Sequence, residues 1–264
     1  MAERYVQVGG RALDPSDMST WGVAHVAAFW AALVLGQELL HYLLMMVDTC
    51  TSARIPESGK FLEKLSRKDY LFIYINRLSV PLMMFCLIRT AWLGGLPGGH
   101  IAWAAADATA LNTVGSLLGM FLLYDAIYVP FHWALHLRAL YPWIHKHHHA
   151  QCAPARGNVD ASNTHPVEFI LGEFIHVLVV ALVPAHVYAV GVFIIGGGVL
   201  ASLNHTRFDI SIPGFFNVRA HDKHHHAITV NYGQYAMFVD SLFGTYAPSN
   251  SKVVYKSDLK DKRL

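Results

Sequence analysis

Long apolar runs constrain this sequence more than any other feature. The first extends from about Trp21 to Val47, and the second from Leu71 to Leu93. A third lies within Ile101–Val129, and Pro130 is expected to end it. A helix needs about 20 consecutive apolar residues to cross the hydrocarbon core of a bilayer, and each run can supply them. A fourth run, Val167–Leu203, contains Pro184 near its middle and therefore predicts a hairpin of two helices. The chain is 54% hydrophobic and only 14% charged, which is typical of integral membrane proteins.

Basic residues predict the orientation of these spans. The polar segment Asp48–Asp69 contains five of them, at Arg54, Lys60, Lys64, Arg67 and Lys68. By the positive-inside rule this segment is cytoplasmic, and following the spans from there places the histidine-rich segments and the C-terminus on the same side. We therefore expect an all-α, multi-pass helical bundle of about three spans plus a hairpin, with a cytoplasmic histidine-rich helical cap. Residues 1–130 would hold the N-terminal transmembrane helices. Residues 131–264 would form the catalytic region, including a membrane hairpin at about 167–203, in one continuous fold.

Charge and cysteine content argue against three other classes of protein. A net charge of only +2 gives no indication of nucleic-acid binding. The three cysteines, Cys50, Cys86 and Cys152, are widely spaced and odd in number, so they indicate neither a disulfide framework nor a zinc ribbon.

Histidines are concentrated in three short clusters. The chain has 17 of them, and most fall in His132–His136, His145–His149 and His221–His226. Residues three or four apart lie on one face of a helix, so each cluster can present several imidazoles together. Imidazole is a good ligand for zinc, copper, iron and nickel. Eight or nine imidazoles are too many for a single ion, and the pattern therefore predicts a cage that holds two.

Other histidines and membrane charges have simpler explanations. Isolated histidines such as His25, His100, His176 and His186 are expected to be hydrogen-bonded or surface groups. Glu38 and His41 lie on one face of the first span, and burying them in lipid would be costly. We therefore expect that face to make a polar contact with a neighbouring helix.

The three clusters resemble the histidine boxes of the fatty-acid hydroxylase and sterol desaturase superfamily of membrane di-iron enzymes. In that family the boxes read His-x-x-x-His, His-x-x-His-His and His-x-x-His-His, in this order. Four further features match the family pattern: Asp125 seven residues before the first box, His165–Glu168, Asn231–Gln234 and Asp240–Tyr246. The resemblance extends from Leu123 to about Pro248.

The resemblance implies nine metal ligands and no catalytic residues beyond them. They are His132, His136, His145, His148, His149, His205, His221, His224 and His225. This register leaves His147 and His226 without a role in metal binding, and His165 would support a turn. The segment Asn204–Asp209 has Thr206–Arg207 where the family usually has Ser-Gly, which leaves the geometry around His205 open.

The resemblance also implies a chemistry. Two iron ions, which zinc can replace in purified protein, would use O2 as co-substrate to oxidise a C–H bond of a lipid by hydroxylation or desaturation. Electrons would come from cytochrome b5 and its NADH-dependent reductase. His165–Glu168 looks most like methylsterol oxidases and Asn231–Gln234 like sterol desaturases, so a sterol or similar lipid is expected. Fatty-acyl or sphingolipid hydroxylation is an alternative within the enzymes. A histidine-rich membrane metal transporter or sensor is an alternative of another class.

Charged residues outside the boxes suggest supporting roles. Four carboxylates could accept the ring N–H groups and fix the histidine tautomers: Asp125, Glu168, Asp222 and Asp240. Solvation at the surface is the alternative, above all for Asp222 and Asp240. Three basic residues could offer a docking face for an acidic electron donor, or could instead face solvent or phospholipid: Lys146, Arg219 and Lys223. The C-terminal Lys260–Leu264 resembles a dilysine retrieval signal, which predicts residence in the endoplasmic reticulum membrane with a cytoplasmic active site and C-terminus.

Overall fold

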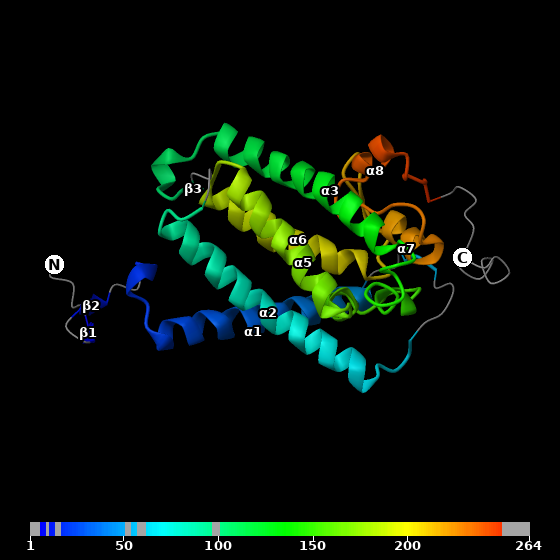
Figure 1. The fold of residues 1–264 in the computed structure, drawn as a ribbon, viewed down its shortest axis with the longest axis horizontal. Helices are drawn as coiled ribbons and strands as arrows, with labels where there is room; N and C mark the ends of the chain where they lie inside the picture. The colour runs from blue at the N-terminus through cyan, green and yellow to red at the C-terminus, as the bar shows by residue number, and fades with distance from the viewer. Residues whose placement is uncertain are drawn as a thin grey trace.

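The computed structural model describes residues 6–8, 11–13, 17–50, 54–56, 62–96 and 101–249. The dilysine segment Lys260–Leu264 therefore lies outside the described residues. Long helices run beside one another along the molecule, and shorter ones gather at one end (Figure 1). The long helices are α1 (Val23–Cys50), α2 (Arg67–Trp92), α3 (Ser116–Leu135), α5 (Pro166–Leu182) and α6 (Val187–Asn204).

Short elements connect and cap these helices. The short helices in the described part of the chain are η1 (Met18–Thr20), η2 (Ala105–Asp107), η3 (Leu111–Gly115), η4 (His148–Ala150), α4 (Asn158–Ser162), α7 (Val218–Ala227) and α8 (Met237–Phe243). Three two-stranded pairs complete the described fold: antiparallel β1 (Val6–Val8) with β2 (Arg11–Leu13), parallel β3 (Ile101–Ala102) with β4 (Ala185–His186), and antiparallel β5 (Ser211–Ile212) with β6 (Phe216–Asn217). The fold is therefore mostly helical, with α7 and α8 at the end opposite β3 (Figure 1).

Four of the described helical segments are long and apolar enough to cross a membrane. They are Val23–Val47, Arg67–Trp92, Leu111–Leu135 and Val187–Asn204. Only 0 to 33% of their most apolar windows is buried within the protein, so most of this apolar surface faces outward, as lipid contact requires. This confirms the predicted membrane helical bundle. The helix break predicted at Pro184 lies between α5, which ends at Leu182, and α6, which begins at Val187.

Local sequence explains where two of these helices begin. Ser66 precedes α2, and its hydroxyl accepts from the Asp69 backbone N–H while the Asp69 carboxylate accepts from Ser66 N at 2.6 Å. This reciprocal capping satisfies donors that a helix start leaves open. Pro166 is the first residue of helix α5, where its missing N–H costs nothing because the first N–H groups of a helix have no partner within it. The ring of His165 accepts a hydrogen bond from Val167 N. His165 is thus a helix-capping residue, as expected of a turn position.

The end of the third span differs from the prediction. We expected Pro130 to terminate this helix, but α3 continues through Pro130 to Leu135. Proline removes one backbone hydrogen bond from a helix interior and usually kinks it. In this protein the following turn carries His132, which is 2% exposed and is fixed by tertiary hydrogen bonds. These contacts hold the last turn in helical form where proline alone would end it.

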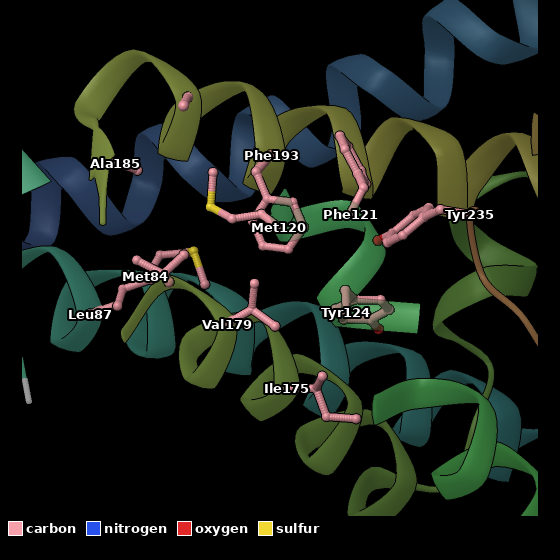
Figure 2. Close-up of a cluster of buried hydrophobic side chains, with 12 residues drawn as sticks. Met84, Leu87, Met120, Phe121, Tyr124, Ile175, Val179, Ala185, Phe193 and Tyr235 are labelled. Atoms are coloured by element: carbon pink, nitrogen blue, oxygen red, sulfur yellow. The ribbon is translucent and has the colours of Figure 1, made fainter. Parts of the chain in front are cut away.

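A core of apolar side chains joins four of the long helices beneath the cap. Met84 of α2, Met120 and Phe121 of α3, and Val179 of α5 pack with residues of α6, as Figure 2 shows. Tyr235, from the segment before α8, projects into the same cluster (Figure 2). The cap is therefore anchored within the bundle.

The expected polar contact on α1 is present. The carboxylate of Glu38 lies 2.8 Å from the guanidinium of Arg77 on α2. On the same helix the buried amide of Asn76 donates to the carbonyls of Ser162 and Thr164, each at 2.9 Å. These bonds tie α2 to both α1 and the segment that leads into α5.

Candidate metal centre

The structure gathers all nine predicted ligand histidines into two groups. The first group consists of His132, His136, His145, His149 and His224. The second consists of His148, His205, His221 and His225. Within each group the ring nitrogens available to a metal lie within 4.8 Å of one another. That spacing is what the ligands of a single ion require.

Local helical geometry distributes the boxes between the groups. His132 lies in the last turn of α3 and His136 caps that helix, so their spacing of four residues places both rings in the first group. On α7, His221 and His225 face the second group while His224 faces the first. In the second box, His148 belongs to the second group, whereas His145 and His149 belong to the first. Because two boxes serve both groups, the two groups must be adjacent.

Ring nitrogens face one another within each group. Nε2 of His145 lies 3.0 Å from Nε2 of His132 and 2.9 Å from Nε2 of His149. In the second group, Nε2 of His221 lies 3.3 Å from that of His205 and 3.1 Å from that of His225. Adjacent ligands of an octahedral ion with metal–nitrogen bonds of about 2.1 Å are about 3.0 Å apart. The observed spacing therefore fits imidazoles that share an ion.

The other ring nitrogen of several histidines is held by a protein acceptor. Nδ1 donates to a carbonyl or carboxylate in five cases: His132 to Tyr232 O at 2.7 Å, His145 to Glu168 at 2.8 Å, His205 to Ala201 O at 2.8 Å, His224 to Val230 O at 2.8 Å and His225 to Gln151 O at 3.0 Å. A proton fixed on Nδ1 leaves Nε2 as a lone-pair donor that points into the group. This is the tautomer that a metal ligand needs.

Burial keeps these imidazoles neutral. It lowers the pKa of His145 to about 3. Burial, reinforced by neighbouring imidazoles, also holds the pKa of His221, His224 and His225 well below the ordinary value. Neutral rings whose lone pairs converge repel one another unless a cation lies between them. The donor set thus fits two metal ions, and the two buried ring nitrogens of His136, which have no hydrogen-bond partner among the described residues, fit the same conclusion.

Two of the four predicted supporting carboxylates act on the backbone. Asp125 accepts from the backbone N–H groups of Gln234, Tyr235 and Ala236, and makes no contact with a ring in the described residues. Asp240 accepts from Tyr232 N and Gly233 N, each at 2.7 Å. The prediction that these two carboxylates accept ring N–H groups is wrong. They fix instead the segment whose Tyr232 carbonyl orients His132.

The other two carboxylates also differ from each other. Glu168 accepts from His145 Nδ1, as predicted. Asp222 pairs with the guanidinium of Arg207, which is 1% exposed. Arg207 also donates to the carbonyl of Ile55 at 3.2 Å, so it links α7 to the segment before α2. Arg207, at a position where the family usually has glycine, thus adds a buried ion pair and a hydrogen bond close to His205. The sequence alone did not reveal these contacts.

The histidines predicted to be spare lie outside both groups. His147 hydrogen-bonds the side chain of Asn163 at 2.9 Å and lies 3.2 Å from Asp69. Nδ1 of His226 lies 2.7 Å from the carbonyl of Asp222, one turn earlier in α7. The assignment of ligands remains a prediction, but the geometry separates these two residues from the nine.

Sequence reasoning missed the backbone carbonyls that orient the rings. Tyr232 O, Val230 O and Gln151 O each accept from a histidine, and nothing in a side-chain pattern identifies them. The nearest available signal was the Asn231–Gln234 motif, which places two of these carbonyls in or beside it. The motif's role is therefore structural support for the first and third boxes.

Comparison with known proteins agrees with this geometry. Residues 117–245 match the fatty acid hydroxylase family. This part of the chain, about half of it, is similar to that family. The match covers the histidine boxes, α5 and α6, and the Asp240 segment that supports the centre.

Three relatives of this chain are named for three different reactions. The chain is 31% identical over 174 residues to fatty acid hydroxylase ahd1 of Mycosarcoma maydis, covering 63% of this chain and 44% of that protein. It is 24% identical over 238 residues to very-long-chain aldehyde decarbonylase GL1-8 of Oryza sativa subsp. indica, covering 84% of this chain and 88% of that protein. It is 30% identical over 140 residues to methylsterol monooxygenase 1 of Rattus norvegicus, covering 50% of this chain and 47% of that protein. The chain thus spans less than half the length of two of these relatives. No solved structure matches it significantly.

Proposed function

We propose that this chain is a membrane-embedded oxidase that uses two iron ions and O2 to oxidise a C–H bond of a sterol or similar lipid. One observation carries the proposal. Two groups of buried, neutral imidazoles are adjacent, and three members of the second group, His148, His205 and His221, line a cavity between the helices. Similarity to the fatty acid hydroxylase family supports an oxidative role.

The protein's own residues would hold and orient the reactants. Bound iron supplies the O2 chemistry that side chains cannot perform. The nine histidines hold the ions without adding negative charge, and Glu168 and the Tyr232 carbonyl fix two of the rings. The buried boxes keep bulk water from the centre, since seven of the nine histidines are less than 5% exposed.

The cavity beside the centre suits a lipid that enters from the bilayer. Its lining includes Tyr128, Phe131 and Phe169, and it adjoins a second cavity lined by Leu40, Met84 and other apolar residues of the membrane helices. A lipid could therefore reach the histidines without crossing water. Membrane lipid is the partner that this arrangement favours.

The substrate class is open to direct test. The relatives are named for fatty acid, aldehyde and methylsterol chemistry, so similarity to them alone does not select among these classes. We favour a sterol or similar lipid because His165–Glu168 and Asn231–Gln234 resemble sterol-acting members. Fatty-acyl oxidation is the second candidate, favoured by the similarity to fatty acid hydroxylase ahd1.

An external electron donor completes the proposal. We propose cytochrome b5 with an NADH-dependent reductase, and residence in the endoplasmic reticulum membrane with the histidine boxes facing the cytoplasm.

The predicted basic docking face needs revision. Lys223 is 7% exposed and bonds the carbonyl of Pro248, and Arg219 pairs with Asp209 at 2.6 Å. Lys146 remains exposed beside the second box.

Expression in a host that lacks its own sterol C–H oxidation tests the function. Lipid extracts with and without the chain, compared by mass spectrometry, should differ by an oxidised sterol or related lipid that depends on O2 and reductant. Iron chelation should abolish the product. An oxidised acyl lipid would select the second candidate. Metal flux across vesicles with no change in any lipid would instead support a transporter.

A further inference from the structure

Three polar side chains lie among the membrane helices and take no part in holding the histidine groups. Glu173 and His176 lie one turn apart on α5, and Tyr235 reaches His176 from the segment before α8. Nε2 of His176 lies 2.9 Å from the Tyr235 hydroxyl, and Nδ1 lies 4.0 Å from a carboxylate oxygen of Glu173. We call these three residues the α5 triad. The sequence had suggested only that His176 is an ordinary hydrogen-bonded residue.

The α5 triad has hydrogen-bonding capacity that the described protein leaves unused. His176 is 7% exposed, and its Nδ1 has no hydrogen-bond partner among the described residues. The carbonyl of Gly172, one turn earlier, comes near this ring without the geometry of a hydrogen bond. The separation of 4.0 Å from Glu173 is also too long for one. Buried polar groups are normally satisfied, so a partner from outside the protein is indicated.

The α5 triad lies where two cavities meet. One cavity, of about 150 Å³, is otherwise mostly apolar and includes Leu40 and Met84 in its lining. The other, of about 90 Å³, is lined by His148, His205 and His221 among others. All three triad residues line both cavities. A molecule that passes from the apolar cavity to the histidines must therefore pass the triad.

Helix α6 is fitted closely around the α5 triad. A Cβ atom at Gly197 would lie 2.7 Å from the Tyr235 hydroxyl and 3.4 Å from Nε2 of His176. The first distance is shorter than real Cβ contacts, so any other residue at this position would displace the hydroxyl. Glycine at position 197 therefore permits the triad to keep its geometry.

We propose that the α5 triad binds one uncharged hydroxyl group of the lipid substrate, with the rest of the lipid in the apolar cavity. This subsite rests on the proposed function, since it concerns the substrate of the same centre. If His176 Nε2 accepts from the Tyr235 hydroxyl, Nδ1 carries the proton and can donate to the ligand. A hydroxyl can accept that proton and donate its own to Glu173. A carboxylate or phosphate head group would be repelled by Glu173.

The reacting carbon of such a lipid lies near its hydroxyl. The α5 triad and three histidines of the second group, His148, His205 and His221, line one cavity of about 90 Å³. A hydroxyl bound at the triad therefore holds the neighbouring carbons beside these histidines.

Binding of matched lipids to the full-length protein in nanodiscs tests the subsite without turnover. The probes are octadecan-1-ol, its methyl ether, octadecanoate and octadecylamine, each competing with a photoreactive octadecanol. The methyl ether keeps the acceptor but loses the donor, so wild-type protein should prefer the alcohol to the ether by about tenfold. Octadecanoate should compete more weakly than the alcohol.

Variants assign that preference to the α5 triad. Glu173→Leu should reduce the ratio of alcohol to ether affinity to below about twofold, because it removes the acceptor of the ligand's O–H. Tyr235→Phe should weaken the binding of alcohol and ether alike, because it removes the group that holds the Nδ1 proton of His176 in place to donate to either ligand. Gly197→Ala should do the same by displacing the Tyr235 hydroxyl. Glu38→Leu, which removes a carboxylate from a membrane helix outside the two cavities, is the control and should keep the wild-type ratio. Tyr235→Phe preserves the shape of the ring, so it tests the proposal even where Glu173→Leu fails to fold.

Three outcomes overturn the subsite: equal affinity of wild-type protein for alcohol and ether, an unchanged ratio in folded Glu173→Leu together with unchanged affinities in Tyr235→Phe, or a preference for octadecylamine over the alcohol. Oxidation is measured separately, with reductant and O2. A triad-dependent alcohol preference without any lipid oxidation would refute the proposed function and leave the subsite standing. Lipid oxidation with no alcohol preference would refute the subsite and leave the proposed function standing.

Discussion

Nδ1 of His132 and the backbone carbonyl of Tyr232 are joined by a hydrogen bond of 2.7 Å, although 100 residues separate them in the chain. Asp240 holds this carbonyl in place by accepting from the backbone N–H groups of Tyr232 and Gly233. Asp125 holds the next part of the same segment. The orientation of the first histidine box thus depends on a segment near the C-terminus.

Replacing Asp240 should therefore weaken the metal centre from a distance. In Asp240→Ala the two backbone N–H groups lose a charged, 0% exposed acceptor, which should destabilise the fold by about 3 kcal/mol. Thermal unfolding of purified protein and its metal content both report the effect, and both should fall. Asp209→Ala, which breaks an exposed pair with Arg219, should change stability by less than about 1 kcal/mol. Equal behaviour of the two variants would contradict this role for Asp240.

The two histidine groups predict the metal content. Each group offers enough ring nitrogens for one ion, so folded protein should contain two metal ions per chain. Iron is the expected metal, and zinc can replace it in overexpressed protein. Elemental analysis of monodisperse protein checks the count. One ion or none per folded chain would show that the two groups do not act as a pair of sites.

Neighbouring histidines in the second box should differ sharply in importance. His148 belongs to the second group, whereas His147 lies outside both and bonds Asn163. His148→Ala should lower activity by at least about 100-fold, since loss of one ligand exceeds the 10-fold to 100-fold effect typical of supporting partners. His147→Ala should keep much of the wild-type activity. Lipid oxidation and metal content in the two variants provide the measurement, and similar losses in both would show that the box is wrongly registered.

The third box allows a second matched pair. His224 belongs to the first group, and His226 bonds the Asp222 carbonyl outside both. His224→Ala should lose activity and metal, while His226→Ala should bind metal normally. Stability must be compared as well, because His226 is only 6% exposed and its removal can disturb packing. The prediction fails if His226→Ala loses an ion while remaining folded.

The sequence by itself determined the membrane bundle and the residues that gather at the centre. Apolar runs of sufficient length leave helices as the way to satisfy the backbone in lipid, so the number and positions of the spans follow from composition. The spacing of histidines at three and four residues follows helical geometry, so the boxes could be recognised without a fold. Pro184 marked the break between α5 and α6 for the same local reason.

Tertiary structure alone decided how the histidines divide and what supports them. His148 and His149 are adjacent in sequence but belong to different groups, because their rings leave the chain in different directions. Pro130 lies inside a helix because the following turn is held by contacts with Tyr232. Asp125 and Asp240 bind backbone N–H groups, and Glu173, His176 and Tyr235 meet across the bundle. The contacts of Asp125, of the turn after Pro130 and of Tyr235 with His176 join residues far apart in the chain, and only packing of the helices brings them together.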